Sequence, residues 1–132
     1  MLRSVLAVIA GYVSLSLLVM TSFALIMVIM PQAFPKPGAA PADSLLILIL
    51  TLGFAFAVIG GYLTAIIADR SHFKHVLFLA AVVLGFGIVK IAVEYGIFPM
   101  WYLLTQLASG IGGVLAGGKM RLAIKPVLSK QV

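Results

Sequence analysis

Cysteine is absent from the 132-residue sequence, and charged residues are scarce. The lack of cysteine excludes disulfide bonds, thiolate nucleophiles, cysteine-ligated zinc and iron–sulfur clusters. Only 9% of the residues are charged and only 3 are acidic, whereas 64% are hydrophobic and the mean hydropathy is +1.27. A soluble domain is about half apolar and about a quarter charged. This composition therefore predicts an integral membrane protein.

Four long apolar runs follow one another with short connections. A helix needs about 20 apolar residues to cross about 30 Å of hydrocarbon. The runs predict transmembrane helices over about 4–30, 45–68, 76–95 and 100–118. The first run exceeds the apolar core of a signal peptide, about 7–15 residues, so we expect it to remain as an anchor. We predict an all-α membrane protein with one transmembrane domain, an antiparallel bundle of four helices.

The segments between and after the runs have a different character. Residues 31–44 are rich in proline, which predicts an exposed external loop. Asp43 and Ser44 suit the N-cap of the second helix. Residues 119–132 form a basic tail, in which we expect Pro126 to limit any continuous helix.

Basic residues outside the runs lie almost entirely on one side of the predicted membrane. The termini and the 68–76 connection carry Arg3, Arg70, Lys74, Lys119, Arg121, Lys125 and Lys130, and the other side carries Lys36. By the positive-inside rule, both termini are cytoplasmic. The net charge of +6 does not indicate a nucleic-acid partner, because the basic residues do not form one patch.

Small residues recur every four positions in two of the runs. They are Gly53, Ala57, Gly61 and Ala65 in the second run, and Ser109, Gly113 and Gly117 in the fourth. Such stripes let helix backbones approach closely in lipid. The two helices can pack against each other within the chain, or one stripe can face another integral membrane subunit. We expect membrane lipid to be bound around the bundle.

Lys90 and Glu94 are the charged residues inside the predicted spans. They lie four positions apart and therefore on one helix face. Folding the third and fourth runs about the turn at 96–99 brings Lys90 to the depth of Thr105 and Gln106. An ionisable residue in a membrane is a functional candidate, although Lys90 can also snorkel to the outer interface. The group predicts an anchoring ion pair, a subunit contact, or a proton or solute site.

Histidine is rare and lies in a short basic connection. Of His72 and His75, the second is closer to the bilayer and is the candidate ligand for a haem or pigment. Solvated loop residues are the simpler interpretation. We predict no cofactor and no metal site.

One part of the sequence resembles a known group of proteins. The segment GGYLTAIIADRSHFKHVLFLA, with a fourth run that opens on Trp101-Tyr102 and closes on SGIGGVLAGGKMR, resembles a broad group of small, uncharacterised, four-helix bacterial inner-membrane proteins. The resemblance implies a bacterial inner-membrane location but no activity. Small multidrug resistance transporters are similar in length, but they depend on a Glu in the first helix, and the first run here has none.

Three function classes follow from these features. We expect a small accessory or structural subunit of a larger membrane complex, respiratory or photosynthetic, with no chemistry of its own. The alternative is a small oligomeric transporter or channel that uses Glu94 and Lys90. An enzyme is the weakest hypothesis, because a lone Glu beside a Lys provides few groups for catalysis.

Overall fold

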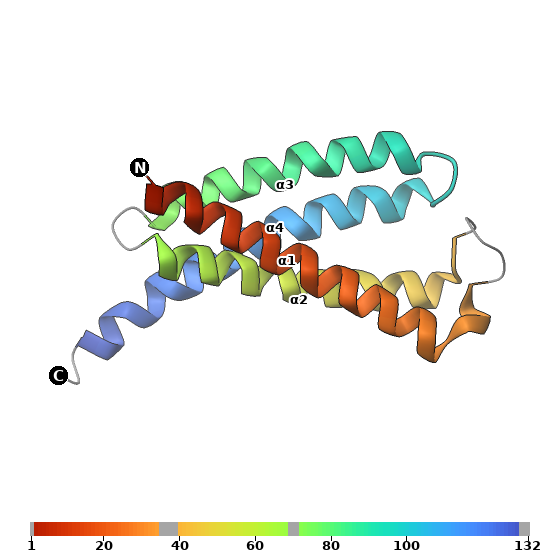
Figure 1. Ribbon diagram of the computed structural model, residues 1–132, viewed down its shortest axis with the longest axis horizontal. Helices are drawn as coiled ribbons and strands as arrows, with labels where there is room; N and C mark the ends of the chain where they lie inside the picture. Colours follow the sequence, from red (N-terminus) through yellow and green to blue (C-terminus); the bar gives the residue numbers. More distant parts are fainter. Residues whose placement is uncertain (1, 35–39, 69–71, 130–132) are drawn as a thin grey trace.

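The structure is a computed structural model, and the part of the chain that it describes is all-helical. It describes residues 2–34, 40–68 and 72–129, with side chains for 5–34, 40–68 and 74–124. Within these ranges the elements are α1 (Leu2–Ile29), the 3-10 helix η1 (Pro31–Ala33), α2 (Asp43–Ile67), α3 (His72–Glu94) and α4 (Met100–Ser129) (Figure 1). The prediction of an all-α protein is confirmed.

Three of the described helices are long and apolar enough to cross a membrane. They are Val5–Ile29, Asp43–Ile67 and Lys74–Glu94. Helix α4 is as long as these helices but less apolar, because Gln106, Ser109 and a series of glycines dilute its aliphatic residues. The sequence-based expectation of a membrane protein is therefore met by three of the four helices.

Two helix ends differ from the prediction. Ala42 is the N-cap of α2 and makes no side-chain hydrogen bond, so the expectation that Asp43 or Ser44 caps this helix was wrong. Asp43 lies instead in the first turn, where its negative charge interacts favourably with the helix dipole. Helix α4 continues through Pro126 to Ser129, contrary to the expectation for the tail. Proline in the last turn removes only one hydrogen bond of the helix.

Successive helices run in opposite directions. The start of α1, the end of α2, the start of α3 and the end of α4 lie at one end of the molecule, and η1 and the α3–α4 turn lie at the other (Figure 1). The α3–α4 turn is tight: the amides of Ile97 and Phe98 both donate to the carbonyl of Glu94. Gly96 has a φ of +85°, which only glycine adopts readily.

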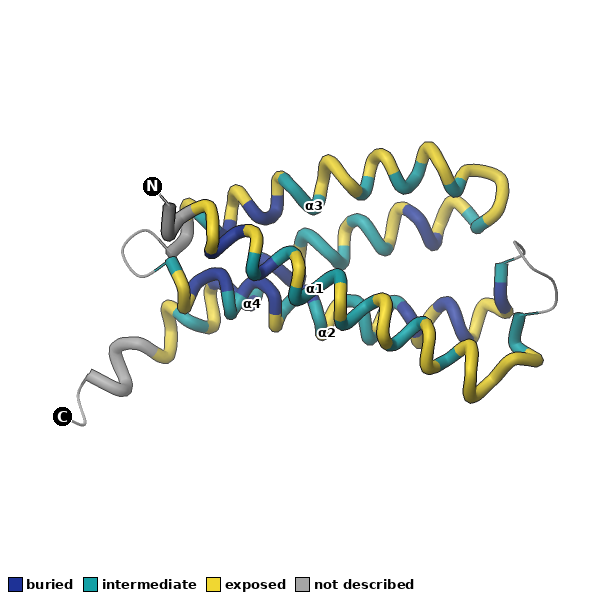
Figure 2. Tube along the Cα trace, viewed as in Figure 1, coloured by how far each residue is buried: buried dark blue, intermediate teal, exposed yellow. Residues whose placement is uncertain are grey.

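Helix α2 is the central helix, because it contacts α1, α3 and α4. Its contact with α4 is the most extensive in the described structure. Buried side chains form two clusters along it (Figure 2). The terminal-end core includes Ala57, Ala65, Val76, Leu79 and Val114, and the turn-end core consists of Leu45, Leu46, Ile49, Tyr102 and Leu103.

Helices α1 and α3 contact each other from the terminal-end core as far as the middle of α3. There the rings of Tyr12 and Phe86 stack with centroids 5.0 Å apart. Further along, α1 follows α2 towards η1, and α3 continues away from it to the α3–α4 turn (Figure 1). This divergence leaves space between α1 and α3 on the turn side of the two rings.

Candidate functional site

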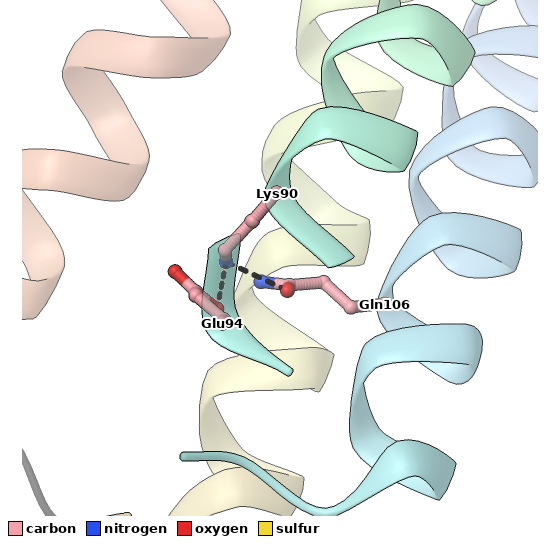
Figure 3. Close-up of polar contacts among 3 residues, drawn as sticks. All are labelled: Lys90, Glu94 and Gln106. Carbon is pink, nitrogen blue, oxygen red and sulfur yellow. Dashed lines mark hydrogen bonds and ion pairs between the residues drawn. The ribbon is translucent and has the colours of Figure 1, made fainter. Parts of the chain in front are cut away.

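Lys90, Glu94 and Gln106 form the polar cluster that the sequence predicts between α3 and α4. The Lys90 ammonium donates a hydrogen bond of 2.7 Å to Gln106 Oε1 and lies 3.7 Å from Glu94 Oε2 (Figure 3). The Lys90 and Glu94 side chains are 40% and 26% exposed at the protein surface. The cluster is thus neither buried in a core nor fully on the surface.

Glu94 is only partly satisfied by this arrangement. Its Oε2 atom is buried and accepts no hydrogen bond from the described residues. The 3.7 Å separation from Lys90 is an ion-pair distance but is too long for a hydrogen bond. The side chain as a whole is 26% exposed, and its other carboxylate oxygen is directed away from Lys90, so an additional donor can reach the carboxylate through that oxygen (Figure 3).

Tyr102 belongs to the same cluster and was not predicted. Its phenol lies near the Gln106 side chain and the Glu94 carboxylate. Tyr102 is 3% exposed, and its ring stacks on Phe98 with centroids 5.4 Å apart. The i,i+4 spacing of Tyr102 and Gln106 was a signal in the sequence that could have revealed this contact.

Thr105 does not join the cluster. It is exposed, and its hydroxyl donates a hydrogen bond of 2.6 Å to the carbonyl of Trp101 in its own helix. The i→i−4 bond satisfies a hydroxyl that would otherwise be unpaired in lipid. Thr105 and Gln106 are adjacent in α4 and therefore point about 100° apart, which is why only one of them faces α3.

A cavity of about 500 Å³ adjoins the polar cluster and is open to the surface. We call it the α1–α3 groove. Its walls come from all four α-helices, and its lining residues include Tyr12, Leu15, Val19 and Met20 of α1, Gly53 and Ala57 of α2, Phe86, Lys90 and Glu94 of α3, and Gln106, Leu107 and Ser109 of α4. Most of these side chains are apolar, so the charged groups occupy one part of an otherwise apolar surface.

The groove runs along α3, and its two ends differ in their lining. The stacked rings of Tyr12 and Phe86 lie at one end, and Glu94 lies eight positions further towards the α3–α4 turn. At 1.5 Å per residue, this separation is about 12 Å. Figure 3 shows Glu94 directed towards the side on which α1 passes, where the groove lies.

The small-residue stripes of α2 and α4 pack mainly against each other. Gly113 lies against Ala57, where an added Cβ would come within 2.6 Å of the Ala57 Cβ atom. A Cβ at Gly61 would overlap the carbonyl of Val114, and one at Gly117 would overlap that of Val58. Ala65 is fully buried in the terminal-end core. The close approach of the two helices requires glycine at these positions.

Three small residues at the edges of the stripes have other surroundings. Gly53 and Ser109 both line the α1–α3 groove, and the Ser109 hydroxyl donates to the carbonyl of Gln106 at 3.0 Å. A Cβ at Gly53 would meet no atom within 4 Å. Gly112 also has open space around it and is exposed on the outside of α4. These three residues therefore lie outside the closest contact between α2 and α4.

His75 is half-buried in the first turn of α3 and interacts with neighbouring groups. The side chain of His72 lies outside the described residues. Among the residues described, no three His, Cys, Asp or Glu side chains lie close enough together to hold a metal ion. The sequence-based hypothesis of a haem or pigment at His75 remains a prediction.

The polar cluster offers several groups that can bind a ligand. It offers one cation with three N–H donors, one carboxylate with an unfilled acceptor, one amide and one phenol. No family model, no curated protein and no solved structure matches this chain.

Proposed function

We propose that the chain crosses a bacterial inner membrane four times as an antiparallel bundle, with both termini in the cytoplasm. The three strongly apolar helices support three of the spans. Helix α4 makes its longest contact with α2, a strongly apolar helix, so α4 enters the bilayer beside it. The basic residues Lys74, Lys119 and Arg121 lie towards the end of the molecule that holds the termini, as the positive-inside rule requires of a cytoplasmic side.

We propose further that the protein is a small accessory subunit of a larger membrane complex. The observation that carries this proposal is the outward face of α4. Thr105, Ala108 and Gly112 are all exposed there, on the least apolar of the α-helices. Trp101 and Leu104 are exposed at the start of this face, and beyond them it consists of small and polar residues, which pack well against another helix and poorly against lipid tails.

The packing of α2 and α4 strengthens this argument. Gly113 and Gly117 already satisfy the contact with α2, so Gly112 is not needed for it. Large apolar residues such as Leu or Ile suit a lipid-facing position at least as well as glycine does, and they favour the helix by up to about 1 kcal/mol. Gly85 in α3 is exposed too, but it stands on one face with the large exposed side chains of Ile88 and Val89. Gly112 instead continues a face of small residues, for which a subunit contact gives a physical reason.

The test is to replace Gly112 and to look for loss of a partner. Gly112→Leu should leave the isolated chain folded, because no atom lies within 4 Å of the added Cβ. The matched control is Gly85→Leu in α3, which is also exposed and also has open space. Both variants are extracted in mild detergent, and their co-purifying subunits are identified by native mass measurement.

The proposal expects a stoichiometric set of different subunits with the wild-type chain and with Gly85→Leu, but not with Gly112→Leu. Equal recovery of these subunits with both variants would contradict the assignment of this face. Recovery of only a homo-oligomer would contradict the accessory role.

A second candidate function is a small oligomeric transporter, and the α1–α3 groove favours it. Lys90 and Glu94 both line this cavity, which is large enough for a small solute. The two candidates predict different results for the Glu94→Gln variant: a transporter should lose solute flux, whereas an accessory subunit should not. We rank the accessory role first, because the groove is open along its side rather than forming a path through the bundle.

A further inference from the structure

We propose that the α1–α3 groove is a binding site for a phospholipid with a primary amine in its headgroup, of the phosphatidylethanolamine type. In this site the lipid phosphate binds Lys90, the lipid ammonium binds Glu94, and one acyl chain lies in the groove. The inference rests on the proposed membrane insertion and is independent of the accessory role, which concerns the outward face of α4.

The shape and lining of the groove fit an amphiphile. Its volume of about 500 Å³ lies within the range of about 300–1,000 Å³ that is usual for ligand sites. Leu15, Val19, Met20 and Leu107 line it, whereas the charged groups lie at the end near the α3–α4 turn. An apolar chain with a polar head matches this distribution, but a small soluble ion does not.

The groove is long and narrow rather than round. Its lining on α3 runs from Val83 to Glu94, about 17 Å at 1.5 Å per residue. A single acyl chain can extend over this length and can adapt its torsions to the irregular walls.

The charges of the cluster match a headgroup that carries both signs. Lys90 has three N–H donors, and Gln106 accepts only one of them. Glu94 Oε2 is buried 3.7 Å from the Lys90 ammonium, and the other carboxylate oxygen is directed away from Lys90, towards the groove (Figure 3). A phosphate can accept from Lys90, and a primary ammonium can donate to Glu94. The quaternary ammonium of phosphatidylcholine has no N–H group and cannot make the second contact.

The depth of the cluster is suitable for a headgroup. Glu94 is the last residue of α3, and Lys90 lies one turn before it. In a spanning helix these positions are at the boundary between the hydrocarbon and the headgroups, where lipid phosphate and amine groups lie. The apolar part of the groove then extends from this boundary towards the centre of the bilayer.

The test is native mass spectrometry of the full-length, delipidated protein in detergent with equal amounts of phosphatidylethanolamine, phosphatidylcholine and phosphatidylglycerol. The wild-type chain should bind about threefold to tenfold more phosphatidylethanolamine than phosphatidylcholine, because one hydrogen bond to a charged group differs between them. Glu94→Gln should weaken this preference, because an amide oxygen still accepts a hydrogen bond but carries no negative charge, and Lys90→Met should lower the binding of all three lipids.

A groove-filling variant tests the position of the acyl chain. Gly53→Leu projects into the groove without meeting another atom at its Cβ, and it should lower phosphatidylethanolamine binding about tenfold. Gly85→Leu, which is exposed and does not line the groove, should bind as the wild-type chain does. Free phosphoethanolamine, which has the headgroup without the chains, should not displace the lipid.

Several results would overturn the proposal. They are equal binding of phosphatidylethanolamine and phosphatidylcholine by the wild-type chain, an unchanged preference in Glu94→Gln, and equal binding by Gly53→Leu and Gly85→Leu. Displacement of the lipid by free phosphoethanolamine would show that the headgroup contact alone accounts for binding. None of these measurements depends on whether a partner subunit is retained.

Discussion

At the scale of single residues, the hydrogen bond from Lys90 to Gln106 determines how much stability is lost when the charge of Glu94 is removed. Lys90 donates to Gln106 at 2.7 Å, a contact between α3 and α4 that does not involve Glu94. Removing the charge of Glu94 therefore leaves the ammonium with one of its two partners and with access to the surface. Ion pairs as exposed as this one contribute only about 0–1 kcal/mol.

We expect Glu94→Gln to accumulate normally in the membrane and to show no loss of any solute-dependent phenotype. The substitution keeps the shape of the side chain and removes its charge. The measurement is growth or proton-driven solute flux, compared at equal protein levels in membranes. A collapse of flux in Glu94→Gln at an unchanged protein level would move the transporter hypothesis to first place.

Thr64 is a second residue whose surroundings determine its role. It is fully buried where α1 crosses α2, and its hydroxyl donates to the carbonyl of Gly60 at 3.0 Å, with that of Ala7 at 3.4 Å. Thr51 makes the same type of bond, to Ile47 at 2.9 Å, but it is exposed. The same residue type on the same helix therefore offers a matched pair.

We expect Thr64→Val to lower the free energy of unfolding by about 0.5–1.5 kcal/mol, because a buried carbonyl of α1 loses a donor. Thr51→Val should change it by less than about 0.5 kcal/mol. Thermal unfolding of both variants in the same detergent measures the difference. Equal losses at the two positions would show that Thr64 contributes only through its own helix.

At the scale of elements, the pairing of α2 with α4 has the strictest steric requirements. Gly61, Gly113 and Gly117 lie where a side chain would meet the backbone or a Cβ atom of the other helix. Gly53 lies on the same face of α2 but faces the α1–α3 groove. Four-residue spacing thus includes a position at which α2 does not closely approach α4.

We expect Gly61→Leu to lower the free energy of unfolding by about 1–3 kcal/mol through overpacking against Val114. Gly53→Leu should change it by no more than about 0.5 kcal/mol, because its Cβ meets open space. The two variants are compared by thermal unfolding in detergent. A Gly61→Leu chain as stable as Gly53→Leu would mean that α2 and α4 pack less closely than described here.

At the scale of the whole molecule, the helix directions and the distribution of charge agree. The start of α1, the end of α2, the start of α3 and the end of α4 lie at one end, which among the described side chains also holds Lys74, Lys119 and Arg121 (Figure 1). The opposite end carries η1 and the α3–α4 turn. One orientation in the membrane then satisfies the positive-inside rule for all connections together.

We expect a reporter fused after Val132 to read cytoplasmic and a reporter inserted near Gly38 to read external. The physical reason is the excess of Lys and Arg on the side that holds both termini. Paired reporters that are active on opposite sides of the membrane provide the measurement. Reversed signals would refute the orientation, and with it the placement of the Lys90 and Glu94 cluster at the outer face.

The sequence alone was enough to predict the helices and part of the polar site. Runs of about 20 apolar residues are needed only in a membrane, so composition and length predicted the positions of all four α-helices to within a few residues, apart from the extension of α4. The i,i+4 spacing placed Lys90 beside Glu94, and the hairpin placed it near Gln106, because both relations depend on local helix geometry.

Only the tertiary structure decided which neighbours each face meets. The α1–α3 groove exists because α1 leaves α3 after the Tyr12–Phe86 contact, and a crossing angle depends on side chains from several helices at once. For the same reason, spacing could not show that Gly61 packs on α4 while Gly53 faces the groove, or that Thr105 points outwards while Tyr102 joins the cluster. Helix periodicity specifies which residues share a face, but the packing of the other helices determines what covers that face.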